Sequence, residues 1–225
     1  MPRLLFSLLM LITLAACARP PAQMAAQAPP PPPPQLLDPD SACLAELRQM
    51  QVEFQPLGQF GDDDQGCGVD NPVKVSATGE TWNRPGVISC PMARTIGQFE
   101  AQVVQPAALI RFGQKVRRII HAGTYDCRTR RTSTQVAAAL GGSKGGRLSE
   151  HSKGRAIDIT GFELADGTIV SVKKDWRGQG EKSAFLQEIA RKACSVFNVT
   201  LTPNHDRLHA DHLHLDIGPY TLCGF

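Results

Sequence analysis

A histidine and an aspartate seven residues apart are the first side chains whose types and spacing suggest chemistry. The segment around them reads LSEHSKGRAIDI, with His151 ahead of a lysine–glycine pair and Asp158 between two isoleucines. If the chain enters a strand at Arg155, Asp158 lies on the strand face opposite to those isoleucines. A buried carboxylate needs a hydrogen-bonding partner or a metal ion. The same alternation also permits an aspartate that faces water.

A second group of polar side chains lies near the C-terminus. Four of the six histidines fall within ten residues, in the segment HDRLHADHLHLD at 205–216. Residues two apart in a strand share a face, so a strand here points His212, His214 and Asp216 one way and the leucines between them into a core. A single histidine is usually a surface residue or a packed one. Two histidines on one strand face, together with the upstream His151 and Asp158, predict a metal or acid–base site.

Both segments resemble a known pattern. His-x6-Asp followed far downstream by His-x-His is similar to the peptidases grouped with lysostaphin, the D-Ala-D-Ala metallopeptidases and the hedgehog fold. The spacing SxHxxGxAxD at 149–158 looks like the D-Ala-D-Ala metallopeptidase form, and HxDHxH at 209–214 looks like the penicillin-insensitive murein endopeptidase form. The stretch from about Cys43 to Cys223, with YDCR at 125–128, most resembles the bacterial extensin-like C-terminal domain family.

This resemblance implies a zinc site. His151, Asp158 and His214 take the positions of the family's zinc ligands, two nitrogens and one oxygen, and such a set leaves a fourth position for water. Zinc lowers the pKa of its bound water to near neutrality, so that hydroxide becomes available. The ligand types favour zinc, although the same set can take other divalent ions.

The resemblance also implies a proton-transfer residue close to the metal. His212 ranks first because it shares a strand face with His214, and His209 ranks second. Asp211 ranks third. It stands three residues before His214, where the dipeptidase branch places a glutamate base, but strand alternation points it away from the metal.

Arg128 is the candidate substrate-binding residue. It follows Tyr125 and Cys127, in a position resembling the arginine that precedes the family's histidine motif. A guanidinium there suits a peptide carboxylate or a developing oxyanion. The alternative is a surface arginine, because Arg130 and Arg131 follow it directly.

The elements that must position these residues follow from the apolar periodicity of the chain. Helices are expected over 41–50, over 91–112 with a kink at Pro106 and an end at Gly113, over 132–140 and over 183–197. Strands are expected over 115–122, 155–164, 168–172 and 212–217, and residues 56–90 are expected to form loop with short strands. The class is therefore α+β, a small and mainly antiparallel sheet flanked by helices. The resemblance adds a hedgehog-like or D-Ala-D-Ala-peptidase-like fold to this expectation.

Six cysteines follow Cys17, and an even number in an exported chain predicts three disulfides. Six cysteines allow 15 pairings. The consecutive pairing is the simplest, and it joins Cys43–Cys67, Cys90–Cys127 and Cys194–Cys223. A zinc–thiolate site is the rival interpretation, but the chain contains no CxxC pair.

The N-terminus has the features of an export signal. Arg3 precedes a largely apolar run of 13 residues that ends in LAAC at Cys17. A transmembrane span needs about 20 such residues. The ending resembles a bacterial lipobox, so Cys17 is the expected lipidation site and residues 1–17 form a lipoprotein signal peptide. An ordinary cleaved signal is the alternative.

Residues 18–39 contain nine prolines, six of them consecutive, and such a composition favours an extended tether rather than a core. A leader without a role is the other interpretation of this segment. The folded domain is expected over 40–225. The resemblance of the N-terminus to a lipobox implies a periplasmic lipoprotein that is anchored to the outer membrane of a Gram-negative bacterium.

The composition narrows the class of protein. With 42% hydrophobic and 20% charged residues the chain is globular, and a net charge of +3 with 6% aromatic residues gives no support for nucleic-acid binding. The expected function is a zinc-dependent peptidoglycan peptidase that cleaves an amide bond of murein stem peptides, as a D,D-carboxypeptidase or an endopeptidase. The alternatives are a lipoprotein that binds zinc and peptidoglycan without cleaving it, and a hydrolase of another amide or ester. The sequence names no protein partner.

Overall fold

The structure, a computed structural model, describes residues 39–130 and 147–225. The chain divides into two units, residues 1–36 and 37–225, and every described residue belongs to the second. The predicted signal peptide, most of the tether, Cys17 and the predicted helix at 132–140 lie outside the described residues. No helix within the described ranges is long and apolar enough to cross a membrane.

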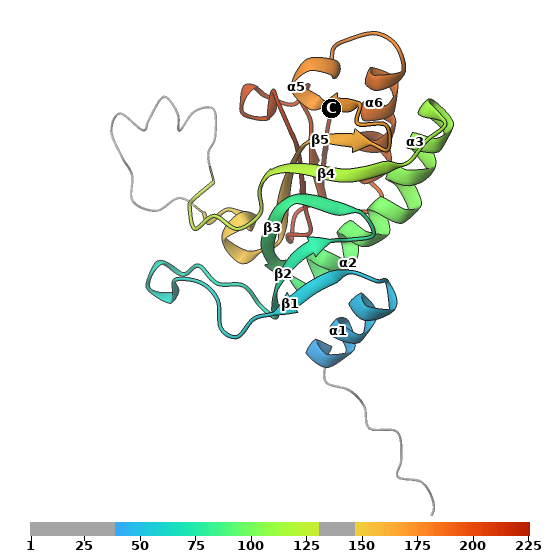
Figure 1. The fold of residues 1–225 in the computed structure, drawn as a ribbon. Helices are drawn as coiled ribbons and strands as arrows, with labels where there is room; N and C mark the ends of the chain where they lie inside the picture. The colour runs from blue at the N-terminus through green and yellow to red at the C-terminus, as the bar shows by residue number, and fades with distance from the viewer. Residues whose placement is uncertain (1–38, 131–146) are drawn as a thin grey trace, which may run out of the picture. The chain divides into compact units, whose positions relative to one another are not determined.

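A nine-stranded sheet organises the domain (Figure 1). Its strand order is β1-β2-β3-β4-β5-β8-β7-β9, with β6 paired to β5 in addition. Six of the eight pairings are antiparallel, and β3–β4 and β7–β9 are parallel. The α+β class is confirmed, but the sheet is larger than the small sheet predicted. The strands are β1 (Glu53–Pro56), β2 (Pro72–Ala77), β3 (Thr81–Ser89), β4 (Val116–Gly123), β5 (Ala156–Leu164), β6 (Ile169–Ser171), β7 (Val199–Leu201), β8 (Leu213–Asp216) and β9 (Leu222–Gly224).

Strand β5 is the centre of this sheet. One edge pairs with β4 along most of its length, and the other pairs first with β8 and then with β6. Ile157 and Ile159 are fully buried in the hydrophobic core, whereas Asp158 between them is only partly buried. The alternation predicted for this strand is therefore present, with one apolar face and one face that carries the aspartate.

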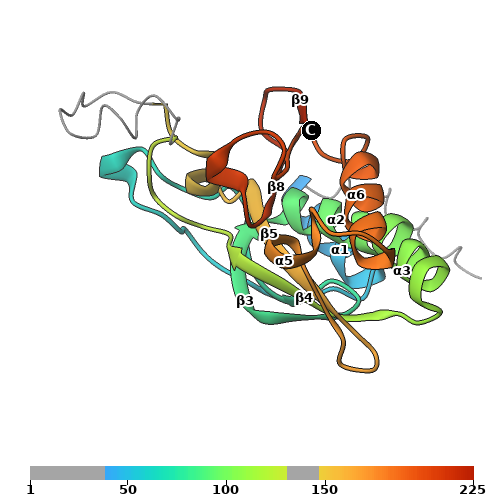
Figure 2. The same ribbon diagram turned by 90° about the horizontal axis from the view of Figure 1, so that it is seen from above.

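Helices cover the apolar face of the sheet. Helices α2, α3 and α6 lie together on one side of β3, β4 and β5 (Figure 2), and Ile96, Phe99 and Phe185 pack from them into the core. The helical elements are α1 (Pro39–Gln49), η1 (Asp63–Gln65), α2 (Cys90–Phe99), η2 (Glu100–Val104), α3 (Gln105–Phe112), η3 (Glu150–Lys153), α5 (Val172–Asp175), α6 (Glu181–Ala193) and η4 (Arg207–His209).

The long helix predicted over 91–112 is present as three consecutive segments. Ser89 caps its N-terminus, and its hydroxyl accepts a hydrogen bond from the Met92 N–H. The segment η2 has π-helical hydrogen bonding, and it lies directly before Pro106, where the kink was predicted. Proline lacks the N–H that an α-helix uses, and a π-turn accommodates such an irregularity. Gly113 adopts a left-handed conformation with φ of 68° and ends the helix, as predicted.

Residues 56–90 are more ordered than predicted, because β2 and the nine-residue β3 form an antiparallel hairpin there. Pro85 and Gly86 interrupt the apolar pattern of β3, and this part of the sequence therefore had the pattern of a loop. Gly86 is required for packing, since an added Cβ would lie 2.7 Å from the Thr124 side chain. Strands β7 and β9 were not predicted, and three residues each are too short for periodicity to show.

Three disulfides cross-link the domain, but the consecutive pairing is wrong for two of them. Cys194–Cys223 forms as predicted, whereas the other four cysteines pair as Cys43–Cys90 and Cys67–Cys127. Helix α1 packs on α2, which brings Cys43 to Cys90. The loop before β2 packs on the segment after β4, where Phe60 meets Tyr125 at 4.9 Å between ring centroids, and Cys67 therefore reaches Cys127. Tertiary packing, not order along the chain, selects these partners.

Candidate metal centre

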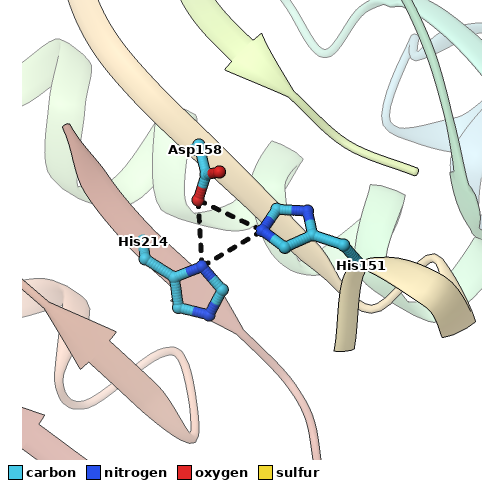
Figure 3. A group of neighbouring side chains, drawn as sticks. All are labelled: His151, Asp158 and His214. Carbon is cyan, nitrogen blue, oxygen red and sulfur yellow. Dashed lines mark hydrogen bonds and ion pairs between the residues drawn. The ribbon is translucent and has the colours of Figure 1, made fainter. Parts of the chain in front are cut away.

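Three side chains that are distant in sequence meet on the sheet face opposite to the helices (Figure 3). Asp158 Oδ1 lies 3.2 Å from His151 Nε2 and 2.9 Å from His214 Nδ1, and the two nitrogens are 3.2 Å apart. Donor atoms around a tetrahedral ion with bonds of about 2.05 Å are about 3.3 Å apart. The three donors therefore have the spacing of one face of such a tetrahedron, and the predicted ligand set forms a possible metal-binding group.

Strand register brings two of these ligands together. In the antiparallel pairing of β5 with β8, Asp158 lies directly opposite His214. Directly opposed residues have Cβ atoms about 4.5–5.5 Å apart and share a sheet face. Leu213 and Leu215, the neighbours of His214, are fully buried in the core, so the alternation that fixes the core also exposes His214 beside Asp158.

A capped turn supplies the third ligand. His151 lies in η3, the 3₁₀ turn before β5, and the Ser149 hydroxyl accepts a hydrogen bond from its backbone N–H at 3.4 Å. Gly154 ends the turn with φ of 60°, and an added Cβ would lie 2.6 Å from Val69. The turn predicted at Lys153-Gly154 thus needs glycine both for its left-handed backbone and for space.

In both histidines, the ring nitrogen that does not face Asp158 forms a hydrogen bond with another residue. His151 Nδ1 lies 2.5 Å from the carbonyl oxygen of Thr124, and His214 Nε2 lies 3.1 Å from Asp216 Oδ2. An N–H that donates to each of these oxygens leaves a lone pair on the other nitrogen, which is the one in the triad. Each histidine is thereby fixed in the tautomer and orientation that a metal ligand needs.

The electrostatics of the triad favour a bound cation. Burial alone would raise the pKa of Asp158, but hydrogen bonds with His151 and His214 outweigh it and hold the pKa well below its usual range. Burial lowers the pKa of His214, yet Asp158 and Asp216 together raise it to about 9. Without a metal the two carboxylates therefore keep a proton on His214. A divalent cation at the triad would take the place of that proton between Asp158 and His214, while Asp216 still accepts the hydrogen bond from His214 Nε2.

The three candidate proton-transfer residues differ in their positions. His212 Nε2 lies 3.6 Å from Asp158 Oδ1, so His212 is beside the triad although it precedes β8 by one residue. The His209 ring lies 5.8 Å from the His214 ring, and burial lowers the pKa of His209, which keeps it neutral and able to accept a proton. The Asp211 side chain is 54% exposed, and its Oδ1 lies 3.0 Å from His212 Nδ1. Asp211 thus contacts His212 rather than the triad.

Two cavities adjoin the triad. The first, which we call the His214 cavity, has a volume of about 320 Å³, and its walls include His209, His212, His214 and Tyr220. The second, which we call the His151 cavity, has a volume of about 570 Å³, and its walls include Arg84, His121, Gly123, Tyr125 and His151. Asp158 and Arg128 line both cavities.

Arg128 therefore lines the same two cavities as Asp158, and its role as a substrate-binding residue stays a prediction. Its Nε lies 2.8 Å from Asp126 Oδ2, and Cys127 beside it is bonded to Cys67. The Arg128 carbonyl accepts the Ser149 N–H at 3.0 Å, which connects this segment to the turn that carries His151. Arg131 lies outside the described residues, and Arg130 pairs with Glu150 at 2.7 Å.

Two residues at the site were not predicted. Asp216 orients His214, and its place on the same strand face was the available signal. His121 of β4 is 3% exposed and lines the His151 cavity. As a lone histidine in an apolar strand it gave no signal, because its neighbour Asp158 is more than 30 residues away in sequence.

Comparison with known proteins identifies the family but gives no characterised relative. No curated protein and no solved structure matches the chain. Residues 41–224 match the family described as extensin-like protein C-terminus, and the match covers all of the described elements except the first two residues of α1. The chain therefore belongs to the extensin-like protein C-terminus family.

Proposed function

We propose that this protein is a zinc-dependent peptidase of the cell wall, which hydrolyses an amide bond in murein stem peptides. The observation that carries the proposal is the triad of His151, Asp158 and His214, whose donor atoms lie within 3.2 Å of one another beside two cavities. Two imidazoles and one carboxylate form a common set of protein ligands for catalytic zinc, which keeps an open position.

The two second-sphere hydrogen bonds to His151 and His214 support a resident metal. A bound zinc ion would supply a Lewis acid and a water of lowered pKa at this position. Thr124 and Asp216 hold the two imidazoles so that their free nitrogens face Asp158. Removing such outer partners typically weakens metal binding in zinc enzymes.

The chain's own residues supply the remaining parts of an amide hydrolysis. His212 is close enough to the triad to accept a proton from an attacking water and to return it to the leaving nitrogen. Asp211 orients the His212 ring through Nδ1, and His209 is a second neutral acceptor in the same cavity wall. Arg128 adds positive charge where a substrate carboxylate or the oxyanion lies.

The substrate assignment rests on sequence resemblance as well as on the site. The motifs SxHxxGxAxD and HxDHxH are similar to those of D-Ala-D-Ala metallopeptidases and murein endopeptidases, whose substrates are murein peptides. The predicted lipoprotein signal with Cys17 and the proline-rich tether would hold the domain in the periplasm, close to peptidoglycan. An exported protein also agrees with the three disulfides.

The test is digestion of purified peptidoglycan by the full chain with Cys17→Ser, with analysis of the released muropeptides by mass spectrometry. We expect stem-peptide cleavage that a chelator abolishes and zinc restores. His214→Ala should lose stoichiometric zinc and at least about 10³-fold in rate, equivalent to about 4 kcal/mol. His205→Gln is the matched control, because His205 contacts Asp206 and not the triad.

Intact peptidoglycan after incubation with the zinc-loaded protein would contradict the proposal. Stoichiometric zinc together with retention on peptidoglycan, and no cleavage, would then indicate the alternative function of a binding lipoprotein.

A further inference from the structure

The two cavities lie on different sides of the metal triad. His214 lines only the first and His151 only the second, whereas Asp158 lines both. A ligand at the triad therefore has space in two directions. Each cavity is within the range of about 300–1,000 Å³ that small-molecule sites occupy. A substrate in one cavity alone would leave the other to water.

The His151 cavity exists because the sheet opens beside the triad. Strands β3 and β4 pair only at Thr81–Trp82 with Arg118–Ile119. Beyond that point side chains make the contacts between the two strands. The Asn83 side-chain amide donates a hydrogen bond to the His121 carbonyl and accepts one from the His121 N–H. The two strands then form facing walls of the cavity, from Arg84 to Val87 and from His121 to Thr124. The sheet thus supplies two walls of this cavity, and the segment after β4 with Tyr125 and Arg128 completes it.

A buried histidine, His121, also belongs to the wall of this cavity. His121 Nε2 lies 2.9 Å from the Arg84 carbonyl, so Nε2 carries the hydrogen and donates it. With the hydrogen on Nε2, Nδ1 is the acceptor nitrogen of the ring. Among the described residues His121 Nδ1 is one of two buried side-chain polar atoms without a hydrogen-bond partner. Through its Nε2 hydrogen bond His121 connects β4 to β3 within the cavity wall.

We infer that the site binds an extended peptide through both cavities, so that the bond at the triad is internal to the substrate. The inference rests on the proposed function and narrows it to an endopeptidase of cross-linked murein. Hydrolysis adds the OH of water to the acyl carbon and its remaining proton to the amide nitrogen as the C–N bond breaks. The products are a carboxylate and an amine, each on a fragment larger than one amino acid.

Arg128 agrees with this arrangement. A carboxypeptidase needs a charged end wall that receives the terminal carboxylate of its substrate. Arg128 instead lines both cavities, and Asp126 already binds its Nε. The guanidinium is therefore positioned alongside the path between the cavities, where it can bind a carbonyl or carboxylate of a peptide that continues past it.

The first experiment compares two substrates of the zinc-loaded full chain with Cys17→Ser. One is a cross-linked muropeptide dimer, and the other is a monomeric pentapeptide muropeptide, from which only a terminal residue can be released. We expect cleavage of the dimer without release of free alanine from the monomer. Rapid release of free alanine from the monomer, with intact dimer, would overturn the inference while the proposed function stands.

The second experiment fills the His151 cavity. Gly123 lines the cavity opposite Asp158, and an added Cβ there meets no atom within 4 Å, so Gly123→Leu places its side chain at the cavity wall beside the triad. Gly58→Leu is the matched control, since Gly58 is exposed, has the same open surroundings and lines neither cavity. Gly123→Leu should lower kcat/KM for the dimer at least tenfold, whereas Gly58→Leu should match the parent. If Gly123→Leu does not fold, Ala122→Leu places an exposed leucine in the same cavity wall.

Binding separates this inference from the proposed function. In the presence of a chelator, the affinity for a fluorescent muropeptide dimer should fall at least tenfold in Gly123→Leu and stay unchanged in Gly58→Leu. If neither substrate is cleaved, the proposed function is wrong, and this affinity alone decides whether the peptide uses the second cavity. Equal affinity in the two variants overturns the inference.

Discussion

The two faces of β5 and β8 carry out different tasks with alternate residues of the same strands. On one face Ile157, Ile159 and Leu213 are fully buried against the helices. On the other face Asp158 and His214 supply two of the three residues of the possible metal-binding group. The apolar face fixes the strand register, and the register in turn places Asp158 opposite His214. Stability and chemistry are thus encoded one residue apart, and substitutions on the two faces should have separable effects.

The sharpest test of this comparison uses two adjacent residues. Leu213→Ala removes a fully buried side chain and should lower the free energy of unfolding by about 2–5 kcal/mol. His212→Gln removes the candidate proton-transfer group and should lower kcat by about 10²–10⁴-fold, with little change in unfolding. Denaturant unfolding in chelator and muropeptide release with zinc measure the two effects. Undiminished hydrolysis by His212→Gln would shift the proton-transfer role to His209.

A smaller effect is expected from Asp216, which lies on the polar face and orients His214 by a hydrogen bond. Asp216→Asn keeps the shape of the side chain but weakens the acceptor that orients His214. We expect zinc affinity to fall by about 10–100-fold, measured by competition with a chromophoric chelator. Asp211→Asn is the control, because Asp211 contacts His212 and none of the three ligands. Equal zinc affinity in both variants would show that Asp216 does not position His214.

The smallest effect is expected at Glu100, a buried acid on the helix side. Burial raises its pKa although Thr78 Oγ1 and the Glu80 N–H both donate to it. A pKa that is higher in the folded state stabilises the fold below the unfolded value of 4.5, and this stability is lost as pH rises through the folded pKa. Glu100→Gln has no group that titrates at this position. As pH rises above 4.5, the free energy of unfolding should therefore fall in the parent relative to the variant. A difference that does not change with pH would contradict this assignment.

The three residues of the possible metal-binding group could be named because they lie in two short motifs that resemble those of known metallopeptidases. His151 and Asp158 are seven residues apart, and the alternation around Asp158 and His214 fixes their faces in any register that buries the isoleucines and leucines. The end of the long helix at Gly113 was also predictable from local sequence, since a glycine with positive φ ends a helix without any contact to a distant segment.

What the sequence did not predict depends on contacts between distant segments. His121 becomes part of the site only because β4 pairs with β5. Strand β3 was not predicted because Pro85 and Gly86 interrupt its apolar pattern. Gly86 is needed there because Thr124 packs closely against it. These features are invisible to patterns of ten or fifteen residues.

The connectivity of the disulfides has a consequence for how the chain matures. In sequence order the cysteines alternate, Cys43, Cys67, Cys90 and Cys127, so the two bonded loops interlock over residues 67–90. A chain that enters an oxidising compartment N-terminus first presents Cys43 and Cys67 before either native partner. Oxidation at that moment joins the wrong pair, and thiol–disulfide exchange must then release Cys67 for Cys127. Formation of the Cys67–Cys127 bond beside Arg128 should therefore depend on a disulfide isomerase more than formation of Cys194–Cys223, whose two cysteines are consecutive in the sequence.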